Sequence, residues 1–279
     1  MESFKKPIIK VENLTFIYPD GTLALEEINL EIYEGEFIGI IGQNGSGKTT
    51  LVKHFNGLLK PTKGEVFIDG VNTKNLTVAQ LSTKVGYVFQ NPDHQICQST
   101  VFDEVAFGPR NLGLSEKEVK ERVQLALKAV GIEKLSRKHP LLVSKGERQR
   151  IAIASVLAMR PKILIIDEPT TGQDYGQSKE IMDLINELNK EGITVIVISH
   201  NMRLIAEYTK RVIVFFQGRI ILDGTTRYVF SQHEVLEKAF IKPPQITRLA
   251  QMLMDHGFKS DILFVHEMYE EFKNKLSFR

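Results

Sequence analysis

The feature that most restricts the fold of this chain is a glycine-rich segment between a short apolar run and a helix-like stretch. Residues 42–49 fit the pattern G-x-x-x-x-G-K-[ST] at every fixed position. In such a loop, glycines let successive backbone N–H groups turn inward, and the next helix adds positive potential. The motif predicts a nucleoside triphosphate site made of Gly42, Gln43, Asn44, Gly45, Ser46, Gly47, Lys48, Thr49 and Thr50.

A pair of acidic residues complements this loop. The apolar run at residues 163–166 is followed by Asp167 and Glu168. A buried parallel strand delivers such residues to the sheet edge where doubly wound sheets bind ligands. We expect Lys48 to reach the outer phosphates and Thr49 and Asp167 to hold Mg²⁺. Glu168 is expected to polarise the water that attacks the γ-phosphate, with its side chain turned the other way.

The overall composition narrows the class of protein. The 279 residues are 42% hydrophobic and 25% charged, which is ordinary for a folded chain with a full core. The net charge of +2 and the absence of long runs of one sign give no support to nucleic-acid binding. The chain has no Asn-Lys-x-Asp guanine motif, so ATP is favoured over GTP. A lone cysteine, Cys97, cannot form an intramolecular disulfide and fits a reducing compartment.

The distribution of apolar residues predicts an α/β fold. Short, β-branched runs typical of buried strands occur at residues 37–41, 85–89, 163–166, 194–198 and 212–216. Helical spacing occurs between them, as at residues 116–130 and 177–190. This alternation predicts the mostly parallel sheet of a P-loop NTPase core. Alternating patterns at residues 8–16 and 28–32, separated by a turn, predict an antiparallel β flank.

The alternation of predicted strands and helices is interrupted in two segments, and these segments suggest the domain organisation. Residues 91–142 show helical periodicity and are predicted to be a helical insert within an ATP-binding domain of residues 1–225. Residues 226–279 are predicted to be a small, mostly helical C-terminal domain for dimerisation or interaction. The most apolar runs are far shorter than the roughly 20 residues needed to span a bilayer. The first ten residues contain Lys5, Lys6 and Pro7, so no signal peptide is expected.

The order of the motifs resembles that of an ABC-type ATPase. The residues that carry this resemblance, after the phosphate loop, are Gln90, Ser144, Gly146, Asp167, Glu168, Asp174 and His200. The resemblance implies that Tyr18 stacks on adenine and that His200 contacts the γ-phosphate. It also implies that Gln90 senses Mg²⁺ and the catalytic water. In the family, the loop that contains Asp174 crosses the dimer.

The signature loop of the family departs from its usual form here. The common Leu-Ser-Gly-Gly-Gln is replaced by Val143, Ser144, Lys145, Gly146 and Glu147. In the family this loop closes over the ATP held by the opposite subunit. We expect Lys145 and Glu147 to weaken that lid, which favours pairing with a different ATPase chain over a homodimer. Gln173 replaces the usual leucine before Asp174, and the sequence does not predict what this change does.

Two longer segments resemble the ATPases of energy-coupling factor transporters. They are residues 90–114 and the C-terminal residues 243–250. The resemblance implies ATP and Mg²⁺ as cofactors and uptake of a vitamin or of a metal ion such as cobalt or nickel. Expected partners are a second ABC-type ATPase subunit, a transmembrane coupling subunit and a substrate-capture membrane subunit, with no nucleic acid. The expected location is the cytoplasmic face of a prokaryotic cell membrane, as a peripheral protein.

Two alternatives remain open from the sequence alone. A soluble ABC-type ATPase acting on DNA or ribosomes would share the core motifs, although such proteins usually carry a long coiled-coil insertion or two ATPase units. A regulatory protein that holds ATP without hydrolysing it would be compatible with the altered signature loop. Glu168 and His200 argue against this second alternative.

Overall fold

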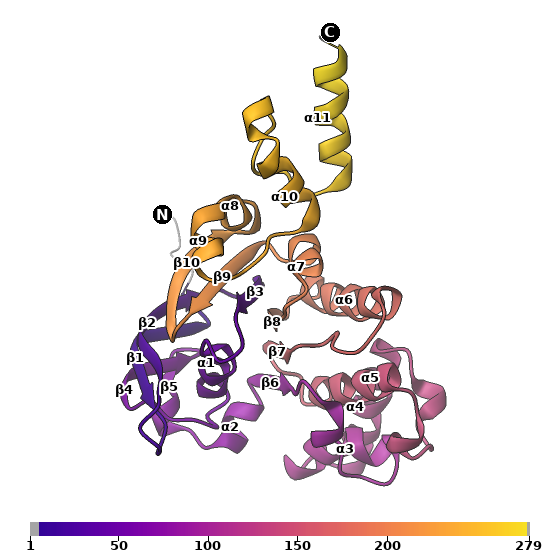
Figure 1. Ribbon diagram of the computed structural model, residues 1–279. Helices are drawn as coiled ribbons and strands as arrows, with labels where there is room; N and C mark the ends of the chain where they lie inside the picture. The colour runs from indigo at the N-terminus through magenta and orange to yellow at the C-terminus, as the bar shows by residue number, and fades with distance from the viewer. Residues whose placement is uncertain (1–5, 278–279) are drawn as a thin grey trace, which may run out of the picture.

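The computed structural model describes residues 6–277, so residues 1–5 and 278–279 of the two predicted domains lie outside it. The described chain contains two sheets. The larger has the strand order β10-β9-β3-β8-β7-β6 and the smaller β2-β1-β4-β5. In Figure 1 the smaller sheet lies on the left, and the larger one crosses the centre of the molecule. The predicted α/β class, with a parallel sheet and an antiparallel flank, is confirmed.

The core of the larger sheet is formed by five parallel strands that are mostly apolar and mostly buried. Its parallel strands are β3 (Phe37–Gly42), β6 (Val85–Val88), β7 (Ile163–Asp167), β8 (Thr194–Ile198) and β9 (Arg211–Phe216). Strand β10 (Arg219–Thr225) closes one edge antiparallel to β9. The strand predictions for the parallel part are therefore confirmed, whereas β10 was not predicted.

The smaller sheet is antiparallel. It contains β1 (Ile9–Ile17), β2 (Leu23–Ile32), β4 (Lys63–Ile68) and β5 (Val71–Asn72). The alternating patterns of β1 and β2 predicted this flank. Strand β4 was missed because it starts with Lys63, Gly64 and Glu65, residue types that are depleted in strands.

One face of the parallel sheet is covered by helices, and the other is covered by one further helix together with the antiparallel sheet. The helices of the ATP-binding part are α1 (Lys48–Phe55), α2 (Val78–Ser82), α3 (Val101–Asn111), α4 (Glu116–Ala129), α5 (Lys145–Leu157), α6 (Tyr175–Lys190) and α7 (Met202–Tyr208). In β3, Ile38 and Ile40 pack with α1 and the antiparallel sheet, whereas Phe37 and Ile41 pack with α5, α6 and α7. Side chains of a strand alternate between faces, so one strand joins both cores.

The predicted insert is helical, as expected. Helices α3 and α4 pack with α5 and form the lower right of Figure 1. Short 3-10 turns complete the ATP-binding part: η1 (Thr73–Asn75), η2 (Pro92–His94), η3 (Glu133–Leu135) and η4 (Pro140–Leu142). Among the described residues, no helix combines the length and apolar character needed to cross a bilayer.

The C-terminal part consists of α8 (Thr226–Ser231), α9 (His233–Lys238), α10 (Gln245–Met252), η5 (Met254–His256) and α11 (Val265–Ser277). In Figure 1, α10 and α11 project away from the sheets. Val229, Phe230 and Leu236 belong to the larger core, while Ala250, Ile262 and Met268 form a small core of their own. The predicted domain boundary after residue 225 stays a prediction, but the packing of α8 and α9 continues the ATP-binding core.

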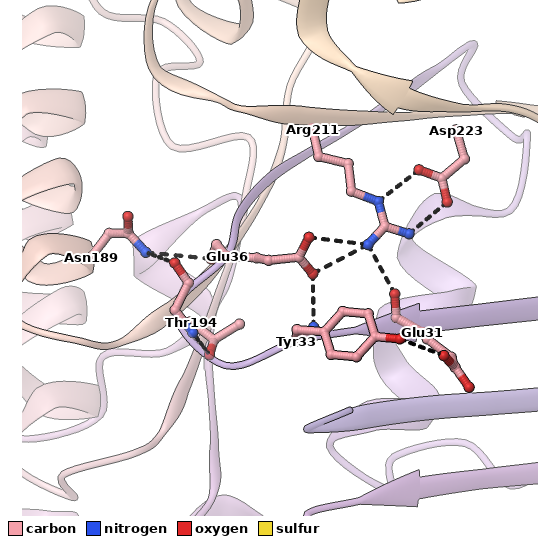
Figure 2. Close-up of polar contacts among 8 residues, drawn as sticks. Glu31, Tyr33, Glu36, Asn189, Thr194, Arg211 and Asp223 are labelled. Atoms are coloured by element: carbon pink, nitrogen blue, oxygen red, sulfur yellow. Dashed lines mark hydrogen bonds and ion pairs between the residues drawn. The ribbon is translucent and has the colours of Figure 1, made fainter. Parts of the chain in front are cut away.

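A guanidinium-centred network fixes the end of the parallel sheet where β3 and β9 begin, as Figure 2 shows. Arg211 donates from Nε and Nη2 to the carboxylate of Asp223 at 2.7 Å each, and from Nη1 to both oxygens of Glu36 at 3.2 Å. Nη1 also donates to the carbonyl oxygen of Glu31 at 2.9 Å. These contacts join β9 and β10 to the end of β2 and to Glu36, the residue before β3. Strand β3 in turn leads into the phosphate loop.

Candidate nucleotide site

Strand register brings the predicted site residues to one edge of the parallel sheet. Ile40 of β3 pairs with Ile198 of β8, which pairs with Asp167 of β7. The phosphate loop therefore follows β3 at the same edge where β7 and β8 end. The carboxyl edge of a doubly wound sheet is its usual ligand-binding edge.

Two glycines of the phosphate loop adopt backbone conformations that residues with a side chain avoid. Gly42 and Gly47 have φ angles of 153° and 106°, and Lys48 is the first residue of α1. A Cβ at Gly42 would collide with the carbonyl oxygen of Phe215, and one at Gly47 would lie 2.7 Å from the carbonyl oxygen of Ala24. Glycine is required at both positions because of this close backbone approach.

The loop lysine lies under the loop itself. Lys48 is 6% exposed, and its Nζ donates to the carbonyl oxygens of Gly42 and Gln43 at 2.7 Å each. Burial lowers the pKa of Lys48, and the nearby carboxylates of Glu168 and Asp167 oppose that shift. Two backbone carbonyl groups of the loop thus hold the ammonium group, and the acidic pair lies near it.

A hydroxyl and a carboxylate meet beside the loop. Thr49 Oγ1 donates to Oδ2 of Asp167 at 2.9 Å, and the hydroxyl of Tyr87 donates to the same oxygen at 2.9 Å. Asp167 is only 5% exposed. Hydroxyl and carboxylate oxygens are the hard ligands that Mg²⁺ prefers, so this donor set fits the predicted metal. Tyr87 was missed in the sequence because a tyrosine inside an apolar strand gives no polar signal.

Glu168, which follows β7, forms a pair with His200, which follows β8. Oε1 of Glu168 lies 3.3 Å from Nε2 of His200, and Oε2 accepts the backbone N–H of His200 at 3.4 Å. Burial raises the pKa of Glu168 to about 7, with a smaller contribution from Asp167, while the His200 N–H lowers it. Burial lowers the pKa of His200, and Lys48 adds to that shift. A carboxylate with a pKa near neutrality suits general-base chemistry.

The backbone at Glu168 is held in an unusual conformation. Its φ of 50° lies in the left-handed region, which is unfavourable for a residue with a side chain. Its N–H donates to the carbonyl oxygen of Ile198 at 2.9 Å, which ties it to the end of β8. Strained backbone of this kind persists only where surrounding contacts determine it, and it is common at functional sites.

Among the described residues, two predicted site residues, Tyr18 and Gln90, make no hydrogen bond to Asp167, Glu168 or His200. The hydroxyl of Tyr18 is 3.0 Å from Oγ1 of Thr50, and its ring packs edge-on against Phe16. Gln90 follows β6 and is exposed. The roles of Tyr18 in adenine stacking and of Gln90 at the metal stay predictions.

A different glutamine connects β6 to α5. Nε2 of Gln95 donates to the carbonyl oxygen of Ala152 and to Oγ of Ser155, at 3.0 Å each. Its Oε1 accepts from the N–H of Phe89 at 3.3 Å. Sequence reasoning missed Gln95, because only the fold places residues 89 and 152 next to each other.

The altered signature loop forms the start of α5. Ser144 is the N-cap residue, and its Oγ accepts the N–H of Glu147 at 3.3 Å. Oε2 of Glu147 in turn accepts the N–H of Ser144 at 2.7 Å, and this bond lowers the pKa of Glu147. The pair is a capping box, so the carboxylate that replaces the usual glutamine is bound to its own helix. The side chain of Lys145 extends out of the helix, and its Nζ donates to the carbonyl oxygen of Thr171 at 2.6 Å.

The loop after Glu168 leads into α6. Asp174 is the N-cap residue of α6, and its Oδ1 accepts the N–H of Gln177 at 2.9 Å. Nε2 of Gln173 donates to the carbonyl oxygen of Pro169 at 3.4 Å. The crossing of a dimer by this loop stays a prediction, and Gln173 has a local role in the turn.

The site opens to solvent through two hollows. One of about 580 Å³ is lined by Gly42, Gln43, Asn44, His200, Met202, Phe240, Ile241 and Lys242. A larger groove of about 1390 Å³ extends from Glu168 and His200 to Phe264 and Tyr269 near the C-terminus. The nucleotide edge is therefore continuous with the C-terminal part of the chain.

Comparisons with known proteins identify the family of this chain. The ABC transporter family model matches residues 25–171. The energy-coupling factor transporter ATP-binding protein EcfA2 of Caldanaerobacter subterraneus is 48% identical over 272 residues, which is 94% of this chain and 95% of that protein. Another ABC transporter ATP-binding protein of that organism is 53% identical over 252 residues, and the match covers 90% of this chain but only 44% of the relative.

Solved structures give the same result. The structure of cbiO1 from Clostridium perfringens, described as part of the ABC transporter complex cbiONQ, has a TM-score of 0.76 and 42% identity, and covers 88% of this chain and 99% of that one. The cassette MJ0796, solved as a dimer with ADP and Pi, has a TM-score of 0.71 and 33% identity over 78% of this chain and 98% of that one. The chain therefore belongs to the ABC transporter family and is an ABC-type, ATP-binding ATPase of the group that includes the energy-coupling factor ATP-binding proteins.

Proposed function

We propose that this chain is the ATP-hydrolysing motor subunit of an energy-coupling factor importer. The observation that carries the proposal is the arrangement at the carboxyl edge of the sheet. Thr49 and Asp167 meet at 2.9 Å at the end of β7, and Glu168, the next residue, lies 3.3 Å from His200. The first pair fits a metal bound to phosphates, and the second fits activation of water beside them.

The proposed roles follow from chemistry and position. The phosphate loop binds the phosphates of ATP through its backbone N–H groups and Lys48. Thr49, Asp167 and Gln90 would hold Mg²⁺, which would neutralise charge on the phosphates. Glu168 orients and deprotonates the attacking water, and His200 donates a hydrogen bond to charge that develops on the γ-phosphate. Tyr18 stacks on the adenine ring.

The proposed active form is a dimer that encloses ATP between two chains. The N-terminus of α5, with Ser144 and Gly146, forms the lid over the ATP of the opposite subunit, and the loop with Asp174 crosses the interface. A different ATPase chain is the favoured partner, because Lys145 and Glu147 depart from the usual lid. Exposed apolar side chains on the C-terminal helices, such as Met252 at 77% and Val265 at 73%, support an additional contact there.

The proposed membrane partners bind the helical insert. Phe107 in α3 is 47% exposed, and Leu112, the C-cap residue of this helix, is 37% exposed. Apolar side chains there fit a transmembrane coupling subunit, with a separate membrane subunit that captures a vitamin or metal ion. ATP binding favours the closed dimer, and hydrolysis releases it, so the motion is passed through the insert. The chain would then lie at the cytoplasmic face of a prokaryotic membrane.

Two measurements test this proposal. A tagged chain, purified from solubilised membranes, is expected to bring a second ATPase and an integral membrane protein with it. The Glu168→Gln variant of that complex should bind ATP as the unchanged complex does but lose turnover by 100-fold or more, on the order expected for a general base. Unchanged turnover would remove Glu168 from its role, and purification without membrane proteins would contradict the transport role.

A further inference from the structure

We propose that Lys145 is a positioning residue for Glu168, acting from the signature loop through the turn that follows the catalytic glutamate. The inference rests on the proposed role of Glu168 as the base. Lys145 is one of the positions at which this chain departs from the usual signature loop. The contact joins the part of the chain that covers the partner's ATP to the base at the chain's own ATP.

Hydrogen bonds connect Lys145 to Glu168 in two steps. Nζ of Lys145 donates to the carbonyl oxygen of Thr171 at 2.6 Å. The N–H of Thr171 donates to the carbonyl oxygen of Glu168 at 3.3 Å. The peptide groups of one turn therefore transmit the position of the ammonium group to the backbone of Glu168.

The turn is shaped to admit the lysine. Gly172 has a φ of 72°, and a Cβ there would lie 2.5 Å from Nζ of Lys145. A side chain at position 172 would therefore push the ammonium group away from Thr171. The same glycine that makes the turn leaves space for its contact with Lys145.

The position of Lys145 within α5 also explains why its side chain extends to the turn at Thr171. Lys145 is the first residue of the helix, where the helix dipole disfavours a positive charge. The carboxylate of Glu147 is bound to Ser144 in the capping box, so it does not form an ion pair with Lys145. The carbonyl oxygen of Thr171 supplies the partner for the ammonium group outside the helix.

The start of α5 is held on its other side by the loop after β6. Nε of Arg148 lies 2.8 Å from Oδ1 of Asp93, and Nη1 of Arg148 donates to the carbonyl oxygen of Val143 at 2.9 Å. A displacement of the loop after β6 is thus passed to Val143 and the first turn of α5. Lys145 extends this connection to the turn at Thr171, and so to the strained backbone of Glu168.

The contact predicts a change in the exchange of backbone amides with solvent. Lys145→Met keeps the aliphatic stem and removes the donor. Hydrogen–deuterium exchange of the nucleotide-free full chain should then be about 3- to 10-fold faster for residues 169–174, the change expected for loss of one hydrogen bond. Lys145→Arg retains a donor and should restore the slow exchange.

Lys117→Met is the matched control. Lys117 is exposed in the first turn of α4, which has the same capping box, formed by Ser115 and Glu118. Among the described residues, Lys117 makes no hydrogen bond or ion pair. Its replacement should leave the exchange of residues 169–174 unchanged, and circular dichroism checks that each variant is folded.

Steady-state hydrolysis by the complex that co-purifies with the tagged chain supplies the second readout. Lys145→Met should lower kcat by on the order of 10-fold with little change in KM for ATP, because the phosphate loop is untouched. Lys145→Arg should recover most of kcat. Unchanged exchange at residues 169–174 overturns the proposal even if kcat falls, since Lys145 would then act on the nucleotide across the dimer. Unchanged kcat overturns it as well.

The two readouts also separate this inference from the proposed function. If the unchanged complex does not hydrolyse ATP, the proposed function fails, and Lys145 cannot position a catalytic base. The exchange measurement needs no hydrolysis, so it still decides whether Lys145 holds the turn at Thr171.

Discussion

Thr49 and Asp167 are 118 positions apart in the chain, yet the hydroxyl of one donates to the carboxylate of the other at 2.9 Å. The contact exists because β3 and β7 each pair with β8 and end at the same edge of the sheet. A phosphate loop alone binds a triphosphate, and an acidic strand end alone binds a cation. Their meeting fits the proposed site for a nucleotide with its metal.

Replacing the carboxylate of this pair should weaken the metal site selectively. Asp167→Asn keeps the size of the side chain but removes the charge that attracts Mg²⁺. We expect the Mg²⁺ concentration for half-maximal hydrolysis to rise by about 10-fold or more, the loss typical of a perturbed metal site. The measurement is ATPase activity against Mg²⁺ at saturating ATP. Asp255→Asn, an exposed change in η5, is the control, and an equal Mg²⁺ requirement in both variants would contradict the assignment.

The largely buried carboxylate of Glu168, whose side chain is 11% exposed, should make the stability of the chain depend on pH. Burial raises its pKa from 4.5 to about 7. Below pH 4.5 the group is protonated in both the folded and the unfolded state. Between pH 4.5 and 7 the unfolded state releases this proton while the folded state retains it, so stability is lost as the pH rises.

Glu168→Gln removes this titration while it keeps an acceptor for the N–H of His200. The variant should equal the parent in free energy of unfolding near pH 4 and exceed it by up to about 3 kcal/mol above pH 7. Urea denaturation of the nucleotide-free chain across this range measures the difference. Glu121→Gln, on the exposed side of α4, should show no such trend. A constant difference between Glu168→Gln and the parent would argue against a buried carboxylate with a raised pKa.

Much of this site could be predicted from local sequence. The phosphate loop and the Asp167–Glu168 pair were found because each has a fixed spacing and follows an apolar strand. Tyr87 and Gln95 were not found, since their partners are far away in the chain and only strand order brings them together. Strand β10 was missed because its Asp223 and Gly224 resemble a turn, although Asp223 is the ion-pair partner of Arg211.

The altered signature loop shows a further limit of sequence reasoning. In sequence, the carboxylate at position 147 predicts a weaker lid over the partner's ATP. In the structure that carboxylate binds the N–H of Ser144, because Ser144 and Glu147 have the spacing of a capping box. Lys145 suggested only a bulky cation, since its acceptor at Thr171 lies on another loop.

Tyr87 should stabilise the chain through its hydrogen bond to Asp167. The phenol donates to Oδ2 at 2.9 Å, and both burial and the neighbouring carboxylate raise the pKa of Tyr87, so it remains a donor at neutral pH. Tyr87→Phe removes one bond to a charged acceptor and should cost about 1.5 to 3 kcal/mol in urea denaturation. Tyr269→Phe, on the exposed face of α11, should cost less than about 0.5 kcal/mol. Equal stability of the two variants would show that the bond contributes nothing.

Arg211 provides the test of the network at the opposite end of the sheet. Its side chain is 22% exposed and is the donor shared by Glu36 and Asp223 (Figure 2). Arg211→Met keeps the aliphatic stem but leaves two carboxylates facing each other without the cation. Breaking a half-buried cluster should cost about 2 to 4 kcal/mol, less than a fully buried one. Arg211→Lys should recover little, because an ammonium group cannot bind both carboxylates in the planar geometry of guanidinium.

Arg219 supplies the comparison that makes this test specific. It pairs with Glu26 at 2.6 Å, but its side chain is 55% exposed, so solvent screens the pair. Arg219→Met should therefore cost less than about 1 kcal/mol under the same conditions. The predicted difference between the two arginines follows from burial and from the number of partners, since both lie on the hairpin of β9 and β10. Equal costs would mean that the Arg211 network does not hold the start of β3 in place.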